Sequence, residues 1–281
     1  GVSLVLSDDG ERVIDDDLVI YNGLMFDPML GQKDVKAKFQ KFEITEFVAN
    51  ELASKYKSVE LALSPFFIDL RPFLWFNYNS EKPEDKFIPD LRYTSLLNIS
   101  SFRDSDEDEE LAIFRNIDTL RQRNLREGKK RGAKVELDFD VEAFMSFYIE
   151  LLESQGENVS EEKRFRMRGL IDHLIRSGKA MGFTLINEEK EPIYKLLHCF
   201  DSKRAYYLFG AGDKSSKDRY KGTFAFWESF KYLAVERKMN EIDLEGINSP
   251  KRGWFKLSFG GTIQPYYKVK KSESVEAKIF P

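Results

Sequence analysis

The stretch from Asp243 to Tyr267 reads DLEGINSPKRGWFKLSFGGTIQPYY, and the order of its residues decides the fold prediction. An acidic segment comes first, followed by a turn, the aromatic run WFKLSF with its central lysine, and the pair Gly260-Gly261. Short apolar runs bounded by turn residues are typical of strands. We therefore expect strands at EIDLEGI, WFKLSF and QPYYKV, with a turn at NSPKRG.

The segments before this stretch alternate between helical and extended patterns. A strand at VELDFD precedes two amphipathic helices, which end near Gly178. The runs GFTLIN, PIYKLLHCF and AYYLFGAG follow, separated by turn residues, and they predict an antiparallel meander. A loop rich in glycine and lysine, from Gly210 to Gly222, then leads into a helix that carries Phe226 and Trp227.

The first part of the chain opens with extended runs, and the apolar spacing from Val35 to Tyr56 predicts one or two helices. Farther on, the acidic run DSDEDEE is followed by the basic run RQRNLREGKKRGAK. Apolar residues from Leu111 to Leu125 predict one helix between the runs, with the charges arranged as the helix dipole favours. We place a domain boundary here, giving domains 1–118 and 119–281, and the last strand can return to the first domain. Since the chain begins with Gly1 and not Met, we expect the first domain to be truncated at its N-terminus.

Composition limits the classes of function. The 281 residues, 42% of them hydrophobic, can fill the core of one large domain or two smaller ones. A net charge of −4 argues against binding nucleic acid or anionic lipid over the whole surface, so any anion site is local. One cysteine and two histidines exclude an internal disulfide and a Cys/His zinc cluster, and we expect no metal. No apolar run approaches the roughly 20 residues of a membrane-spanning helix, so we expect a cytoplasmic protein, whose oligomeric state the sequence leaves open.

The order of elements in the second half resembles the GNAT acyltransferase fold. The predicted class is α+β, with tandem GNAT-like domains that each contain a mixed, mostly antiparallel sheet with flanking helices. In that fold, backbone N–H groups at the start of the helix after the fourth strand hold the pyrophosphate of acyl-CoA. The matching cofactor-binding residues here are Arg219, Lys221, Gly222 and Thr223. Arg219 and Gly222 fit the family pattern R/Q-x-x-G-x-G/A, whereas Phe224 departs from it, and a lysine-rich surface turn is the alternative interpretation.

The closing segment also resembles the FemAB/FemX family of aminoacyltransferases. The residues that carry this resemblance, in order, are Asp243, Gly246, Gly253, Phe255, Lys256, Phe259 and Gly260. The likeness covers Arg121 to Tyr267 well and the first domain loosely; YNGLMF and DLRPFLWFNY look closer to uncharacterised relatives of surface-polysaccharide pathways. The resemblance implies a bacterial cell-envelope transferase whose acceptor is a nucleotide-linked precursor. Aminoacyl-tRNA or acyl-CoA would be the co-substrate, with no tightly bound cofactor.

Three residues of this segment are candidates for catalysis. The resemblance places Lys256 in the active-site region, where its charge would stabilise an oxyanion or the donor's phosphate. The alternative is a lysine on the solvent face of a strand. Asp243 and Glu245 would share one strand face because side chains alternate, and either could accept the proton of the attacking amine. Capping of a turn or pairing with lysine is the alternative for both carboxylates.

Candidate substrate-binding residues come from several segments. The basic run supplies Arg121, Arg123 and Arg126, which suit a pyrophosphate because guanidinium groups bind it in a bidentate manner. Tyr207 and Trp227 could stack on a base, and Phe255 lies beside the candidate lysine in sequence. The alternatives are a solvated helix face for the arginines and core packing for the aromatic residues. An acetyl-CoA-dependent amino-sugar acetyltransferase and a non-catalytic binding module remain open as functions.

Overall fold

The computed structural model describes residues 1–28 and 31–272, and the chain divides into two compact units. The first unit contains residues 1–94 together with the chain from Gln264 onward, and the second contains residues 95–263. The chain passes between them within two strands, β5 (Ile88–Asn98) and β11 (Thr262–Lys271). Within the described residues, no helix is both long and apolar enough to cross a membrane.

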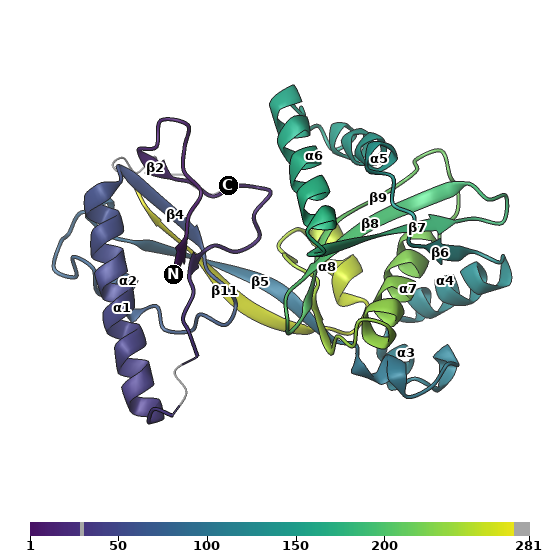
Figure 1. The fold of residues 1–281 in the computed structure, drawn as a ribbon, viewed down its shortest axis with the longest axis horizontal. Helices are drawn as coiled ribbons and strands as arrows, with labels where there is room; N and C mark the ends of the chain where they lie inside the picture. Colours follow the sequence, from purple (N-terminus) through teal and green to yellow (C-terminus); the bar gives the residue numbers. More distant parts are fainter. Residues whose placement is uncertain (29–30, 273–281) are drawn as a thin grey trace. The chain divides into compact units, whose positions relative to one another are not determined.

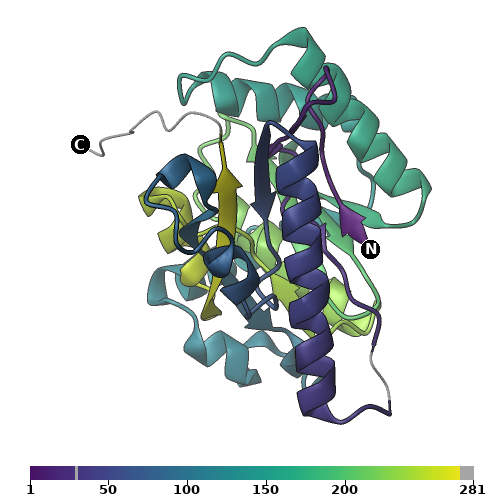
Figure 2. The same ribbon diagram turned by 90° about the vertical axis from the view of Figure 1, so that its left-hand side faces the viewer.

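The first unit combines a small sheet with one long helix. Its strand order is β2-β4-β11, with β2 parallel to β4 and β4 antiparallel to β11, and β1 pairs with β3 separately. Helix α1 buries Thr45, Ala49 and Leu52 on one side and runs beside β4 (Figure 2). The remaining elements are β1 (Val2–Ser3), β2 (Arg12–Val13), β3 (Gly23–Leu24), α1 (Asp34–Lys55), β4 (Ser58–Ala62), α2 (Arg71–Trp75) and the 3₁₀ turn Pro83–Asp85.

The second unit is built on a sheet with the strand order β5-β10-β9-β8-β7-β6. All neighbouring strands are antiparallel except β10 and β9, which are parallel. The elements are the 3₁₀ turns Ser100–Arg103 and Asp108–Glu110, α3 (Ala112–Asn116), α4 (Thr119–Lys130), β6 (Lys134–Glu136), α5 (Val141–Glu153), α6 (Glu161–Arg176), β7 (Ala180–Ile186), β8 (Pro192–Phe200), β9 (Ala205–Gly212), α7 (Lys221–Val235), β10 (Glu241–Asp243) and α8 (Pro250–Leu257). In Figure 1, α7 lies on one side of β7, β8 and β9, and α5 and α6 lie on the other.

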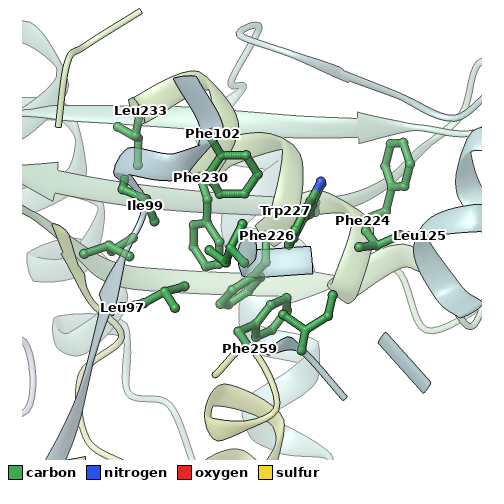
Figure 3. Close-up of a cluster of buried hydrophobic side chains, with 14 of the residues drawn as sticks. Leu97, Ile99, Phe102, Leu125, Phe224, Phe226, Trp227, Phe230, Leu233 and Phe259 are labelled. Atoms are coloured by element: carbon green, nitrogen blue, oxygen red, sulfur yellow. The ribbon is translucent and has the colours of Figure 1, made fainter. Parts of the chain in front are cut away.

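An aromatic core joins α7 to its sheet and to the end of α8. The rings of Phe226, Phe230 and Phe259 meet at centroid distances of 5.5 to 5.7 Å (Figure 3). All three side chains are almost fully buried, and burial of such a ring contributes about 1.5–3 kcal/mol. This core fixes α8, and therefore the candidate lysine, against α7.

Most predicted elements of the second unit are confirmed. The meander is present as β7, β8 and β9, and the predicted α+β class with a mixed, mostly antiparallel sheet and flanking helices is confirmed. The predicted strand WFKLSF is wrong, because residues 250–257 form helix α8. Phe255 and Phe259 are four residues apart and their rings meet edge to face at a centroid distance of 5.4 Å, so the run follows helical spacing despite its short length.

The predicted single helix from Leu111 to Leu125 is also wrong. Asp118 ends that pattern because its carboxylate accepts a hydrogen bond from the N–H of Leu120 at 2.8 Å and caps α4. Residues of the segment before α4 pack in the second unit, where Phe102 and Phe114 contact the ring of Trp227. The division between the units therefore falls at 94/95, upstream of the predicted boundary at 118/119.

Candidate functional site

Lys256 lies on α8 and is buried, with 8% of its surface exposed. Its Nζ lies 5.0 Å from the centre of the Tyr207 ring and donates to the backbone carbonyl of Gly246 at 3.4 Å. The alternative interpretation, a lysine on the solvent face of a strand, is therefore wrong. A buried ammonium is costly unless nearby groups compensate its charge, so its neighbours determine what it can do.

Asp243 is the last residue of β10, and Glu245 lies two residues farther along the chain. The strand ends at Asp243, whose Oδ1 accepts the backbone N–H of Glu245 at 2.8 Å. Glu245 has a positive φ of 58°, a backbone conformation uncommon for residues other than glycine and often associated with function. The predicted alternation along one strand is therefore wrong, because the chain turns between the two residues. Asp243 stabilises that turn and holds Glu245 in place.

The electrostatics of this cluster couple Glu245 to Lys256. Burial raises the pKa of Glu245 well above its usual value; Lys256 opposes the shift and Asp243 adds to it. Burial lowers the pKa of Lys256, and the two carboxylates oppose that shift. The Glu245 Oε1 atom is buried and has no hydrogen-bond partner among the described residues. The pKa values of the two groups thus move toward each other, because burial disfavours the charged form of both.

Two tyrosines form the wall next to this cluster. Tyr207 on β9 and Tyr194 on β8 share a hydrogen bond, and burial raises the pKa of both hydroxyl groups. Both hydroxyls lie against Gly210, where a Cβ atom would come within 2.6 Å of the Tyr207 hydroxyl. Strands β9 and β10 pair only at residues 205–206 and 242–243, so on the β10 side of β9 the pairing ends just before Tyr207.

The predicted cofactor loop leads into the start of α7, which no side chain caps. Lys221 does not extend toward a ligand, because its Nζ donates to the carbonyls of Asp213 and Ser216 and closes the loop. Arg219 is exposed, while the Thr223 hydroxyl is buried and accepts hydrogen bonds from α4. The ring of Phe224, which departs from the family pattern, packs against α4, where a Cβ at Gly128 would come within 2.4 Å of it.

Arg121 connects this helix terminus to α8. Its guanidinium donates to Thr223 Oγ1 at 2.9 Å and to Ser258 Oγ at 2.8 Å, and it lies 4.8 Å from the centre of the Phe255 ring. Burial lowers the pKa of this arginine, with Asp118 opposing the shift, but an arginine remains charged. The structure therefore brings together Arg121 and Phe255, both predicted to bind substrate, and Thr223, predicted to bind the cofactor.

A cavity of about 600 Å³ lies beside Arg121 and is lined by residues of α3, α4 and α8. Lys251 contributes a second positive charge to its lining, and Trp254 contributes a ring that is 74% exposed. Cations next to an exposed aromatic ring suit a phosphorylated ligand that carries a base.

Other predicted substrate residues do not join this arrangement. Trp227 is fully buried, and its indole N–H donates to Asp108 at 3.0 Å, so its assignment to substrate stacking is wrong. Arg126 pairs with Glu109 at 2.8 Å and packs on Phe114. Arg123 is exposed on α4 and is not part of the cavity lining described above.

Three polar residues of this region had no recognisable signal in the sequence. Tyr194 lies within an ordinary strand pattern, and its proximity to Tyr207 follows from the register of β8 and β9. Asn124 on α4 donates to Thr223 Oγ1 at 3.2 Å, and Ser258 accepts from Arg121. Within residues 1–28 and 31–272, no group of three or more His, Cys, Asp or Glu side chains is arranged to hold a metal ion.

Comparisons with known proteins agree on the fold. No family model matches the sequence, and no curated protein matches it. The structure of FemX is similar with a TM-score of 0.59 and 14% identity, over 83% of this chain and 77% of FemX. A conserved protein of unknown function from Bacteroides thetaiotaomicron has a TM-score of 0.55 and 14% identity, over 86% of this chain and 77% of that one.

A third similar structure is L-PGS from Bacillus licheniformis, with a TM-score of 0.51 and 11% identity, over 84% of this chain and 74% of that one. At such low identities the similarity concerns the fold. The chain therefore has the fold of FemX, as its resemblance to the FemAB/FemX family predicts.

Proposed function

We propose that this chain is an N-acyltransferase that moves an aminoacyl or acyl group onto an amine of a nucleotide-linked cell-envelope precursor. The observation that carries the proposal is the cluster of Lys256, which is buried, Glu245, whose Oε1 atom is buried, and Asp243, in a fold that FemX shares. The acceptor class and the envelope pathway come from the family resemblance. The reaction type is inferred from the side chains of Asp243, Glu245 and Lys256.

In the proposed reaction, the neutral amine nitrogen attacks the carbonyl carbon of the donor. A C–N bond forms, and the C–O bond of an aminoacyl ester or the C–S bond of a thioester breaks. Glu245 accepts the proton that the nitrogen loses, and this proton then passes to the departing oxygen or sulfur. A raised pKa makes the Glu245 carboxylate a stronger base than an exposed glutamate, which suits that step.

Lys256 stabilises the negative charge that develops on the carbonyl oxygen. Its ammonium lies in a largely buried position, where charge interactions are stronger than in water. Asp243 acts as a positioning residue, because its hydrogen bond holds the turn that carries Glu245. No covalent enzyme intermediate is needed.

Arg121 and Lys251 hold the phosphate groups of the nucleotide-linked substrate in the cavity beside α8, and Trp254 stacks on its base. The rings of Phe255 and Phe226, 5.2 Å apart, separate Arg121 from the Tyr207 wall of the Lys256 cluster. Phosphate recognition and acyl transfer therefore use neighbouring surfaces of α8.

A second candidate is an acetyl-CoA-dependent amino-sugar N-acetyltransferase. The first turn of α7 favours it, because no side chain caps the N–H groups there and such a terminus binds pyrophosphate. A non-catalytic binding module is the remaining alternative, and it requires that Lys256 and Glu245 be dispensable.

A thermal-shift series on the full chain tests these functions, with aminoacyl-tRNA, UDP-linked sugars and acetyl-CoA as ligands. We expect aminoacyl-tRNA and a UDP-linked sugar to raise the melting temperature, and Arg121→Ala to abolish the shift with the sugar nucleotide. A shift with acetyl-CoA alone selects the second candidate. No shift with any donor contradicts both enzyme proposals.

A further inference from the structure

A second cavity, of about 400 Å³, lies against the opposite face of α7. Its α7 lining includes Glu228, Tyr232 and Val235, whereas Gly222 and Phe226 of the same helix face Phe255 and the tyrosine wall. At 100° per residue these two sets lie on opposite sides of the helix. The cavity is therefore separate from the cluster to which we assign acyl transfer, and its volume is in the range of small-molecule sites.

The wall of this cavity toward the sheet is apolar. Val135 belongs to β6 and Phe183 to β7, and the Phe183 ring meets Tyr232 edge-on at 5.6 Å. Leu137, just beyond β6, is 47% exposed at the rim. Phe183 itself is buried, and an aromatic or branched aliphatic group placed here would cover the parts of Val135 and Leu137 that the fold leaves open to water.

The other wall carries negative charge. Glu228, Glu236 and Asp106 line the cavity, against one cation, Lys231. Lys231 is already engaged, because its Nζ donates to the backbone carbonyl of Asp106 at 3.0 Å and lies 3.7 Å from Asp108. Glu228 has no ion pair and no hydrogen bond to any other described residue.

The surroundings of Glu228 make its negative charge costly. Burial raises its pKa, Asp108 adds to the shift, and Lys231 and Lys129 oppose it. The Nζ atom of Lys129 also lies 3.6 Å from the Glu107 carboxylate, which limits how far Lys129 stabilises the negative charge of Glu228. A ligand that brings a positive charge would relieve this cost, whereas an anion would add to it and a neutral apolar ligand would bury the carboxylate further.

We propose that this cavity binds a small amphipathic amine, whose ammonium group pairs with Glu228 while its apolar body covers Val135, Leu137 and Val235. The proposal rests on the cavity, its apolar wall and its acidic wall, and it does not depend on the acyl-transfer function. Asp106 and Glu236 favour a cation over an anion at the entrance.

The experiment is calorimetric titration of the full chain with phenethylamine, and with 2-phenylethanol and phenylacetate as matched neutral and anionic probes. We expect saturable binding of phenethylamine alone. Glu228→Gln should weaken that binding by roughly tenfold or more, the scale of one charge-assisted hydrogen bond. Glu162→Gln, an exposed change on α6, is the control and should leave the affinity unchanged.

The pH dependence provides a test that needs no substitution. Because a protonated Glu228 carries no charge, the affinity for phenethylamine should fall as the pH drops through the raised pKa of that carboxyl. Val235→Phe should weaken binding by narrowing the cavity. Equal affinity for phenethylamine and 2-phenylethanol, unchanged affinity in Glu228→Gln, or no binding of phenethylamine would each overturn the proposal.

Discussion

Glu245 and Glu228 are two half-buried glutamates of the second unit, and the cations around them differ. Burial raises the pKa of both carboxyl groups, and an aspartate adds to each shift. Glu245 is coupled to the buried Lys256, whereas the cation nearest to Glu228 is held by Asp106 and Asp108. The comparison shows that burial and a neighbouring aspartate raise the pKa of both carboxyl groups, and that the nearby cation distinguishes a site suited to proton transfer from one suited to ligand binding.

Removing the positive charge of Lys256 should have the largest effect on turnover. Lys256→Met keeps most of the side-chain volume but removes the charge, so turnover should fall about 10²–10³-fold, as when an oxyanion donor is lost. The measurement is single-turnover transfer with the donor and acceptor identified by thermal shift. Lys203→Met, in the exposed turn between β8 and β9, is the control and should retain full turnover. Full turnover in Lys256→Met would remove this lysine from the mechanism.

Replacing Glu245 tests whether its carboxylate accepts the proton of the attacking amine. Glu245→Gln should lower turnover by about 10²-fold or more, because the amide cannot accept a proton at neutral pH. In the unchanged protein, kcat should decline with falling pH, starting above the range of an ordinary glutamate since the pKa is raised. The pH–rate profile of both proteins measures this. An unchanged acid limb in the variant would assign the base to another group.

A methyl group added beside the Tyr207 hydroxyl should disturb only the site at Glu245. Gly210→Ala places a methyl group 2.6 Å from the Tyr207 hydroxyl, and such overpacking costs about 1–3 kcal/mol. We expect a lower melting temperature and a reduced kcat, with phenethylamine binding at Glu228 unchanged. Gly169→Ala on α6 is a matched control, because a Cβ there meets no atom within 4 Å. Equal behaviour of the two variants would mean that the wall adapts without cost.

The smallest effect should come from neutralising Glu228. The native state holds the proton of this group more tightly than the unfolded state, so stability falls as pH rises through the raised pKa. Glu228→Gln removes this loss and should raise the melting temperature at neutral pH, with no gain in acid. Melting curves across pH measure it, with turnover expected to remain unchanged. A lower melting temperature in the variant at neutral pH would show that the charged carboxylate has a stabilising partner.

The elements that could be predicted were those in which local pattern and burial agree. The meander strands are separated by turn residues and are buried along most of their length, so their pattern was clear. WFKLSF was misassigned because a short apolar run does not distinguish a strand from a helix, and its contacts with α7 decide the outcome. Trp227 was misassigned because an aromatic residue on a helix looks the same in sequence whether it faces the core or a ligand.

The candidate site was predictable in part. The family resemblance pointed to Lys256 and Asp243, and an assumed strand alternation added Glu245; the structure places the three in one cluster, although the chain turns between Asp243 and Glu245. The link from Arg121 to Thr223 and Phe255 was not predictable, because it joins residues about a hundred positions or more apart in sequence. The cavity at Glu228 had no sequence signal, since its lining comes from α7, two strands and a loop.

The sequence by itself determined the strands of the meander, the α+β class and the identity of the charged residues near the end of the chain. These follow from periodicity and turn chemistry, which act over a few residues. The tertiary structure alone decided that Glu245 lies in the field of Lys256 while Glu228 faces an open cavity. Desolvation and charge proximity set the behaviour of an ionisable group, and both depend on residues brought together only by folding.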